Sequence, residues 1–434
     1  MIKIKFVQEL LNSLFEKPIK SKSFNFFSEK KKSNSTKDFI ENVSSAKGEV
    51  SALVYAELLM QHCEQLSDND LLDFFKLIRD NYEISTKDLS VAIESYKTEQ
   101  SSNNLINLLK LSEPKRREVF RRCNGISRGT IRLVNIRKKL LELLKNNSEL
   151  KAVDHDMVYL FKNWFNRGFL ILRPINWETP AHILEKIIAY EAVHQINSWD
   201  ELRARLAPKD RRCFAFFHPA MQDEPIIFVE VALMKDIPAK IEDVLREKRD
   251  ILDPEETSVA VFYSISNCQK GLAGISFGNF LIKQVANDLN LEFKNLKKFI
   301  TLSPVPGFRK WIRNKFPKID IKLEKCVTPE HFLKNHDLIM HHVGNYFMNS
   351  DRPDGLPNDP VARFHLGNGA SLEQVNFLGD SSKNGKSLSA GIMVNYLYDL
   401  DKVEKNHELL VSEKKINISK QAKNSLFKYI NNSS

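Results

Sequence analysis

The stretch from Ser258 to Trp311 combines a turn able to bind phosphate with a hydroxyl group held in a fixed place. An apolar run, Val259–Ile265, precedes a glycine-rich turn over 271–278, a segment of helical period and a second apolar run. A glycine turn that leads into a helix offers backbone N–H groups to a phosphate. Ser303 ends the second run, and two nearby prolines restrict the backbone around it. This order of elements indicates a phosphate-bearing substrate beside a reactive hydroxyl.

The glycine turn alone is a weak signal. It lacks the Gly-Lys-Ser/Thr ending of a nucleotide-binding P-loop and the strict spacing of a dinucleotide-binding glycine motif. Many nucleotide or coenzyme binders are therefore compatible with it.

His365 is the second residue that could do chemistry. It lies between Phe364 and Leu366, just before an Asn-Gly turn at 368–369 that would let backbone approach a ligand. An imidazole can take or give a proton near neutral pH. Spacing alone favours a histidine that caps a turn, so the catalytic interpretation needs further support.

Three other histidines are interpreted as structural. His218 ends an apolar strand, where a histidine more often has a packing role. The adjacent His341 and His342 would point to different faces of a helix or a strand, which argues against a shared metal ion. No metal site is predicted.

Composition narrows the classes of protein. The chain has 434 residues, enough for two or three domains, and a formal charge of +10. That charge suits nucleic acid, anionic lipid or a nucleotide coenzyme, and equally a solvated lysine-rich surface. No apolar run approaches the roughly 20 residues of a membrane span. Five scattered cysteines without a CxxC pair favour a reducing compartment, so we expect a cytoplasmic protein, or a mitochondrial one if the source is eukaryotic.

The pattern of apolar residues and prolines changes near residue 173. The two patterns together predict an α+β protein. Residues 1–42 are expected to be a flexible basic N-terminus. Residues 43–172 have helical period almost throughout and predict an all-α helical bundle. Prolines and strand-like runs then recur, and strands alternate with helices over 173–434, which predicts a mixed α/β domain.

A basic helix pair, 115–123 and 128–139, leaves an alternative open. Its lysines and arginines flank an Asn-Gly break at 124–125 and could pass for a helix-turn-helix that binds DNA. A charged face on helices is more often solvated or turned toward another subunit.

Taken together, these segments resemble malonyl-CoA decarboxylase over about residues 45 to 400. The resemblance is carried by Phe262–Ser266, Gly271–Lys283, Leu302–Phe308, Asp359–Ala362, Phe364–Leu366 and Asn368–Ala370, and in the helical part by Phe120–Asn124, Gly129–Thr130, Leu133–Val134 and Trp164–Leu170. It implies a helical N-terminal domain that forms a dimer or tetramer and a catalytic domain with the acetyltransferase-like (GNAT) fold. It also implies that malonyl-CoA becomes acetyl-CoA and CO₂ without a metal, biotin or other prosthetic group.

The resemblance also assigns site residues. It implies that Ser303 and His365 are catalytic, that Tyr398 supports them, and that the pair also contacts the acyl-CoA. The loop implied to bind acyl-CoA comprises Ala273, Gly274, Ile275, Ser276, Phe277, Gly278 and Asn279. Some members of the family carry a glutamate where this chain has Ser276, which puts in doubt a carboxylate that orients the catalytic pair here.

The chemistry agrees with these residue types. Loss of CO₂ from a malonyl thioester leaves an enolate, whose oxygen needs donors and whose carbon needs a proton. We expect Ser303 to donate a hydrogen bond to the malonyl carboxylate or thioester oxygen, and His365 to supply or relay the proton. The alternative on the same fold is an acyl-CoA-dependent N-acyltransferase, because a fold does not fix a function.

Overall fold

A computed structural model describes residues 35–275 and 278–431 and divides the chain into two compact units. The first unit holds the chain up to Leu170 together with two short later segments, 218–223 and 269–275. The second holds 171–217, 224–268 and the described residues after 275. Across 35–275 and 278–431, no helix has both the length and the apolar character needed to span a bilayer.

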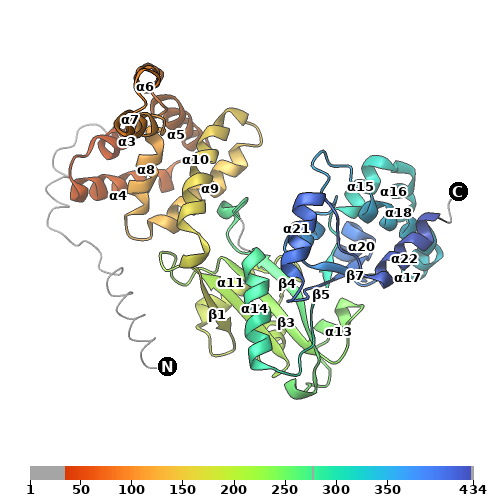
Figure 1. Ribbon diagram of the computed structural model, residues 1–434. Helices are drawn as coiled ribbons and strands as arrows, with labels where there is room; N and C mark the ends of the chain where they lie inside the picture. The colour runs from red at the N-terminus through yellow and green to blue at the C-terminus, as the bar shows by residue number, and fades with distance from the viewer. Residues whose placement is uncertain (1–34, 276–277, 432–434) are drawn as a thin grey trace. The chain divides into compact units, whose positions relative to one another are not determined.

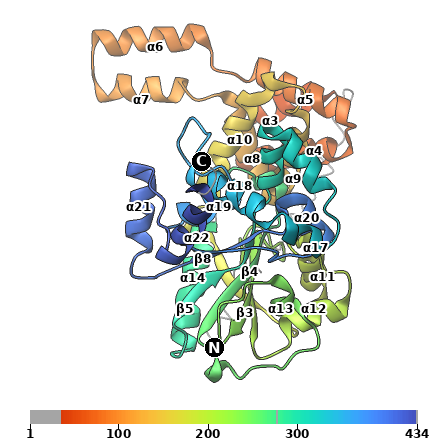
Figure 2. The same ribbon diagram turned by 90° about the vertical axis from the view of Figure 1, so that its right-hand side faces the viewer.

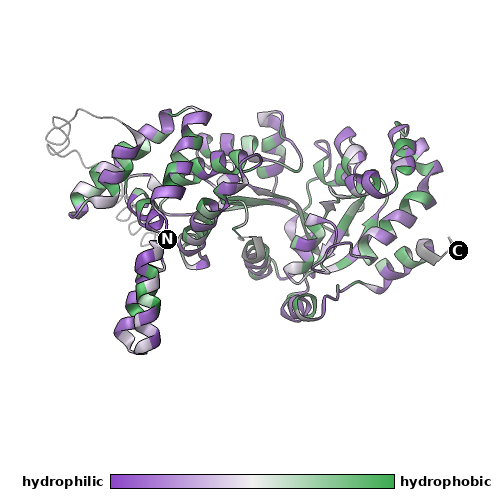
Figure 3. Ribbon diagram, turned by 90° about the horizontal axis from the view of Figure 1, so that it is seen from above, coloured by the Kyte–Doolittle hydropathy of each residue, from purple (hydrophilic) through white to green (hydrophobic). Residues whose placement is uncertain are grey.

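The first unit is helical, as predicted (Figure 1). Its helices are α3 (Thr36–Ser45), α4 (Glu49–Gln65), α5 (Asp68–Asn81), α6 (Thr86–Thr98), α7 (Ser102–Leu111), α8 (Lys115–Asn124), α9 (Gly129–Leu143) and α10 (Lys151–Trp164). Serine residues cap four of them, since Ser35, Ser67, Ser85 and Ser101 each accept a backbone N–H from the first turn. Figure 3 shows hydrophilic and hydrophobic residues alternating along the helices, the pattern of elements that bury one face.

Helix α3 corrects part of the prediction for the N-terminus. It begins inside the stretch 1–42 that was expected to be flexible, and it buries Phe39 and Ile40. A capping box starts it, because Ser35 and Asp38 exchange side-chain-to-backbone hydrogen bonds. The prediction of a flexible terminus is therefore wrong for 36–42, and residues 1–34 lie outside the described residues.

The second unit is built on a mixed eight-stranded sheet. Its strands are β1 (Ile171–Ile175), β2 (Arg211–Phe217), β3 (Ile227–Met234), β4 (Val259–Asn267), β5 (Lys298–Thr301), β6 (Ser303–Pro304), β7 (Ser371–Asn376) and β8 (Met393–Leu397). They lie in the order β1-β2-β3-β4-β5-β8-β6, with β7 also paired to β8, and only β4 and β5 are parallel neighbours. The predicted α+β class is confirmed.

Two neighbouring strands of the sheet, β4 and β5, separate next to Ser303. β4 and β5 pair only over Val259–Phe262 and Lys298–Thr301. β4 then continues to Asn267 beside β3 (Figure 1). The chain after β5 turns to pair Ser303 with Val394 of β8. The predicted hydroxyl therefore lies at the point where the two parallel strands separate.

Helices surround this sheet. They are α11 (Ala181–Tyr190), α12 (Trp199–Leu206), α13 (Ile241–Leu245), α14 (Gly278–Glu292), α15 (Phe308–Lys315), α16 (Pro317–Glu324), α17 (Pro329–Lys334), α18 (His336–Met348), α19 (Pro360–Gly367), α20 (Lys383–Ser389), α21 (Val403–Glu413) and α22 (Lys420–Asn431). On α14 the predicted apolar positions Leu281, Val285 and Leu289 are all fully buried, so the helical period that follows the glycine turn is confirmed.

An ion network ties helices α8 and α10 of the first unit to the turn between α5 and α6. Arg116 is 3% exposed and donates to Asp156 and to Glu83, each at 2.6 Å. Arg117 donates to the other oxygen of Asp156 at 2.6 Å. With Asp156 itself 2% exposed, each charge depends on its partners, because an unpaired buried charge is costly.

We expect Asp156→Ala to lower the free energy of unfolding of the helical unit by about 3–5 kcal/mol, since it leaves two arginines without their shared carboxylate. Urea unfolding followed by far-UV circular dichroism measures this. Asp80→Ala is the matched control, because Asp80 is an exposed partner of Arg79 and its loss should change little. Equal effects of the two substitutions would contradict the interpretation.

Candidate active site

Ser303 and His365 meet inside the second unit. Ser303 Oγ lies 3.1 Å from His365 Nε2, although the two residues come from a strand end and from helix α19. Ser303 is 6% exposed and His365 2% exposed. The contact that spacing alone did not establish is therefore present, in a buried setting where electrostatic interactions are strong.

Tyr398 completes a line of three side chains. Its hydroxyl lies 2.9 Å from Nδ1 of His365, on the far side of the ring from Ser303. The phenol is buried, and burial raises its pKa well above the ordinary value, more than the Asn368 side chain beside it lowers the pKa. Tyr398 therefore stays protonated and has a proton to donate to Nδ1.

The hydrogen bonds around Ser303 assign the tautomer of His365. The Ser303 hydroxyl donates to Thr301 Oγ1 at 2.9 Å, which uses its single proton. Nε2 must then carry a hydrogen and donate to Ser303, while Nδ1 accepts from Tyr398. The backbone N–H of Tyr396 also donates to Thr301 Oγ1 at 3.2 Å, so β8 fixes the residue that receives the serine proton.

Burial keeps His365 uncharged. Desolvation lowers its pKa from 6.5 to about 3, because an imidazolium loses its hydration inside the protein. The ring also stacks on Tyr396, with centroids 4.7 Å apart and planes 24° from parallel. Since the folded pKa lies below the unfolded one, this residue adds stability above about pH 6.5, and that stability is lost as the pH falls toward 3.

The predicted acyl-CoA loop is described only in part. Ser276 and Phe277 lie outside the described residues, and Gly278 and Asn279 begin α14. Ala273, Gly274 and Ile275 belong to the first unit. The site of the loop is therefore given by its backbone ends, and the structure describes none of the side chains from Ser276 to Asn279.

Sequence reasoning missed the residue that holds this loop. Arg137 on α9 donates to the carbonyl oxygens of Gly271 and Ala273, at 2.6 and 2.9 Å. It had been counted only as part of the basic helix pair. A side chain at position 271 would overlap the backbone carbonyl of Val134, so the loop approaches α9 where only glycine fits.

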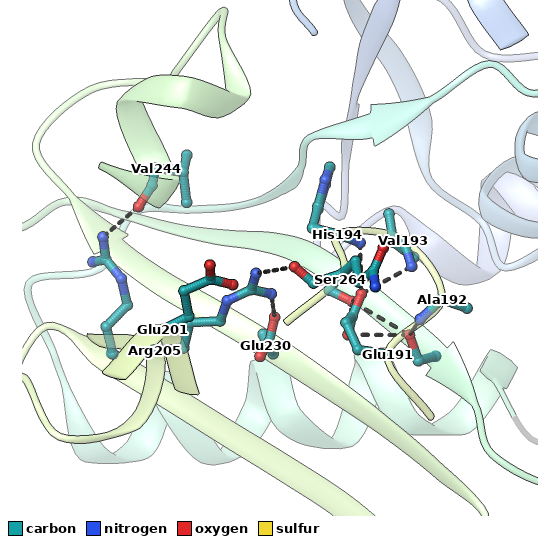
Figure 4. Close-up of polar contacts among 12 residues, drawn as sticks. Glu191, Ala192, Val193, His194, Glu201, Arg205, Glu230, Val244 and Ser264 are labelled. Atoms are coloured by element: carbon teal, nitrogen blue, oxygen red, sulfur yellow. Dashed lines mark hydrogen bonds and ion pairs between the residues drawn. The ribbon is translucent and has the colours of Figure 1, made fainter. Parts of the chain in front are cut away.

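A second polar cluster lies on the face of β3 and β4 and was also missed (Figure 4). The Glu191 carboxylate accepts from Ser264 Oγ at 2.7 and 2.8 Å, from Ser266 Oγ, and from the backbone N–H groups of Val193 and His194. The bonds from Ser264 and Ser266 attach the turn after α11 to β4, the strand that separates from β5.

Glu230 belongs to the same cluster. Arg205 donates to it at 3.1 Å, and burial raises the Glu230 pKa to about 8. A signal for this residue was present in the sequence, because Glu230 is the single charged residue within the apolar run 226–233.

The remaining histidines have structural contacts. His218 contacts the carbonyl oxygen of Trp164 and accepts from the backbone of Ala220, both at 3.1 Å. His341 contacts the carbonyl of Tyr429, and the His342 ring packs against Phe316. Among the residues that the structure describes, no group of three or more histidine, cysteine or carboxylate side chains is arranged to hold a metal ion.

The basic helix pair is mostly engaged within the first unit. Its arginines bond to carboxylates or to backbone carbonyls there, as seen for Arg116, Arg117, Arg121, Arg122, Arg132 and Arg137. These pairings favour the structural interpretation of the pair over the DNA-binding one.

Comparison with known proteins shows which family the chain is similar to. A family model described as the malonyl-CoA decarboxylase C-terminal domain matches residues 168–433, and one described as the N-terminal domain matches 82–165. The solved malonyl-CoA decarboxylase of Agrobacterium vitis is 45% identical, with a TM-score of 0.85 over 90% of this chain and 99% of that one. The one from Rhodopseudomonas palustris is 43% identical, with a TM-score of 0.85 over 90% and 98%.

A relative found by sequence similarity belongs to the same family. Mitochondrial malonyl-CoA decarboxylase of Anser anser anser is 33% identical over 71% of this chain and 68% of its own length. Fold and site together define a two-unit α+β enzyme with a buried serine–histidine pair. The chain belongs to the malonyl-CoA decarboxylase family, and it is an enzyme that converts malonyl-CoA to acetyl-CoA and CO₂.

We expect the His365 imidazole of the free enzyme to remain neutral from pH 8 down to pH 5, because its pKa is lowered to about 3. Carbon-13 labelling of the histidine rings and NMR titration measure this, with the His365 signal assigned as the one missing in His365→Gln. His155→Gln removes an exposed ring and should leave the assigned His365 signal in place. A His365 signal that titrates near pH 6.5 would contradict the assignment.

Proposed function

We propose that Ser303, His365 and Tyr398 carry out the decarboxylation, with the malonyl group bound against Ser303. The observation that carries the proposal is the 3.1 Å contact between Ser303 Oγ and His365 Nε2 in a buried site. A neutral donor pair in a place of low dielectric can stabilise negative charge that develops on a substrate oxygen. Each turnover breaks the bond between C2 and the carboxylate, releases CO₂, and moves the electron pair into the thioester carbonyl as an enolate.

The proton balance assigns a role to His365. Malonyl-CoA carries a carboxylate that acetyl-CoA lacks, so each turnover consumes one proton, which is delivered to C2. In the free enzyme the His365 pKa is about 3. A malonyl carboxylate bound against Ser303 raises this pKa, because a nearby opposite charge favours the imidazolium. His365 then takes up a proton and passes it from Nε2 to C2, directly or through Ser303.

Tyr398 fits both protonation states of the histidine. Its hydroxyl donates to Nδ1 of the neutral ring, at 2.9 Å, and its oxygen accepts from Nδ1–H when the ring is charged. Tyr398 therefore holds the ring in place while its charge changes, and Nε2 stays directed at Ser303.

The coenzyme part of the substrate is assigned to the glycine loop and the start of α14. A 15-residue helix that begins at Gly278 offers backbone N–H groups and the positive end of its dipole to the CoA phosphates. Ala273 to Asn279 are kept as the proposed binding residues. The reaction as proposed needs no group beyond the CoA that the substrate brings, and the cytoplasmic location stays a prediction.

The helical unit is proposed to join chains into a dimer or tetramer through the hairpin of α6 and α7. Figure 2 shows these helices extending from the rest of the helical unit. α7 has no buried residue and α6 buries only Ala92. Val91, Ile106 and Leu109 are each about 60% exposed. A two-helix hairpin with so little buried surface needs a partner, and a second copy of the chain supplies the same apolar face.

We expect purified protein to convert malonyl-CoA to acetyl-CoA and CO₂ with no acyl acceptor present, and Ser303→Ala and His365→Ala each to lower turnover by at least about 100-fold. Liquid chromatography of the CoA esters measures both. Ser412→Ala and His155→Ala remove the same side chains from exposed positions and should act like the wild type. Near-normal turnover in either site variant would remove that residue from the mechanism, and transfer of the intact malonyl group to an added amine, without release of CO₂, would favour the N-acyltransferase.

We expect the double variant Ile106→Glu/Leu109→Glu to run as a monomer of about 50.2 kDa in size-exclusion chromatography with light scattering, while the wild type has a multiple of that mass. Charge on the apolar face would oppose burial of that face against a second chain. Asn103→Glu/Asn107→Glu adds equal charge to exposed polar positions of the same helix and should leave the mass unchanged. An oligomer that persists in the first variant would exclude this surface.

A further inference from the structure

Asp359 joins the chain segment that carries Ser303 to the helix that carries His365. It is 1% exposed, and its two carboxylate oxygens bond in different directions. Oδ1 accepts from the backbone N–H groups of Val361 and Ala362, at 2.8 and 3.0 Å, in the first turn of α19. Oδ2 accepts from the backbone N–H of Gly307, at 3.1 Å, and from the hydroxyl of Tyr346, at 3.3 Å.

We propose that Asp359 is a positioning residue that sets the distance between Ser303 and His365. Gly307 lies four residues after Ser303 on a short proline-containing segment, and His365 lies six residues after Asp359 on α19. The Asp359 carboxylate therefore holds the serine segment at Gly307 and helix α19 at its first turn. This inference rests on the proposed roles of Ser303 and His365.

A helix cap alone does not account for the contacts. An N-cap aspartate needs one oxygen for the backbone of its helix, which Oδ1 provides here. The second oxygen is fully used on a segment 52 residues away in the sequence. Both oxygens of Asp359 therefore act as acceptors, one for each segment.

Gly307 gives independent support. Its φ is −82°, which any residue adopts, so the backbone conformation does not require glycine. A side chain at this position would overlap the Tyr346 hydroxyl oxygen and lie 3.1 Å from Asp359 Oδ2. The absence of a side chain allows the serine segment to reach the carboxylate, which is what a clamp between the two segments needs.

Positioning of this kind affects rate more than binding. A catalytic pair misplaced by about 1 Å loses roughly 100-fold in turnover, whereas contacts to the distant coenzyme are unchanged. A structural cap would instead lower the melting temperature and leave the rate of the folded enzyme intact. The two roles can therefore be separated by measuring kcat, KM and Tm on the same variants.

Asp359→Asn keeps one accepting oxygen and so serves either α19 or Gly307, not both. We expect kcat to fall about 10- to 100-fold with KM for malonyl-CoA within about twofold of the wild type. Ser198→Ala is the control, because Ser198 caps α12, another eight-residue helix. It should lower Tm through a lost cap and leave kcat unchanged. A kcat of Asp359→Asn within twofold of the wild type, or an effect on KM or Tm alone, would overturn the proposal.

A second set of variants tests the clamp from the other side. Gly307→Ala should lower kcat, because its Cβ displaces the segment from Asp359. Tyr346→Phe keeps the bond from Gly307 and should have a small effect alone. In the double variant Gly307→Ala/Tyr346→Phe, removal of the overlapping oxygen should restore part of the lost kcat. Normal kcat in Gly307→Ala, or no recovery in the double variant, overturns the proposal even if Asp359→Asn does not fold.

Failure of the positioning role and failure of the proposed site give different results. If Ser303→Ala and His365→Ala lose turnover while the Asp359 and Gly307 variants keep it, only the positioning role is excluded. If Ser303→Ala or His365→Ala keeps turnover, the catalytic assignment itself is wrong.

Discussion

The arrangement depends on a buried imidazole held without charge against a serine hydroxyl. A charged ring would lose its hydration there, and no carboxylate in the described network bonds to His365 to offset that loss. Tyr398, Ser303 and Thr301 instead form a chain of neutral groups, each with a place for its proton. In the proposed reaction the substrate brings its own carboxylate, so a site made of neutral groups suits an anionic acyl group.

The second unit also buries two glutamate side chains, Glu191 and Glu230, and each has hydrogen-bond donors beside it. Glu191 receives hydrogen bonds from two serines and two backbone N–H groups, so its charge is shared among fixed donors. Glu230 has Arg205 but fewer donors, and its pKa rises to about 8. Both lie where β4 leaves β5. A strand without a neighbour on one side has fewer backbone bonds to hold it, and these side chains attach it to the turn after α11 instead.

The sequence predicted the parts of this site better than their assembly. Apolar runs and helical period were enough for β4, for α14 and for β5, the strand just before Ser303, because these patterns follow from local burial. The contact between Ser303 and His365 spans 62 residues, and no local pattern encodes it; the resemblance to a known family supplied it. Glu191 and Arg137 were missed because their partners come from distant segments, so their roles depend on tertiary structure. The start of α3 was missed although Ser35 and Asp38 form a cap that the sequence displays.

Neither unit is one continuous stretch of chain, so a single cut cannot separate the two units. The first unit takes in 218–223 and 269–275 from the later part of the chain, and Arg137 holds the second of these segments to α9. The polypeptide therefore changes units at five places, and no single peptide bond separates one from the other. A shortened gene that starts near residue 171 would encode the glycine loop without the helix that shapes it. A truncated enzyme that keeps the glycine loop as described must therefore also keep α9.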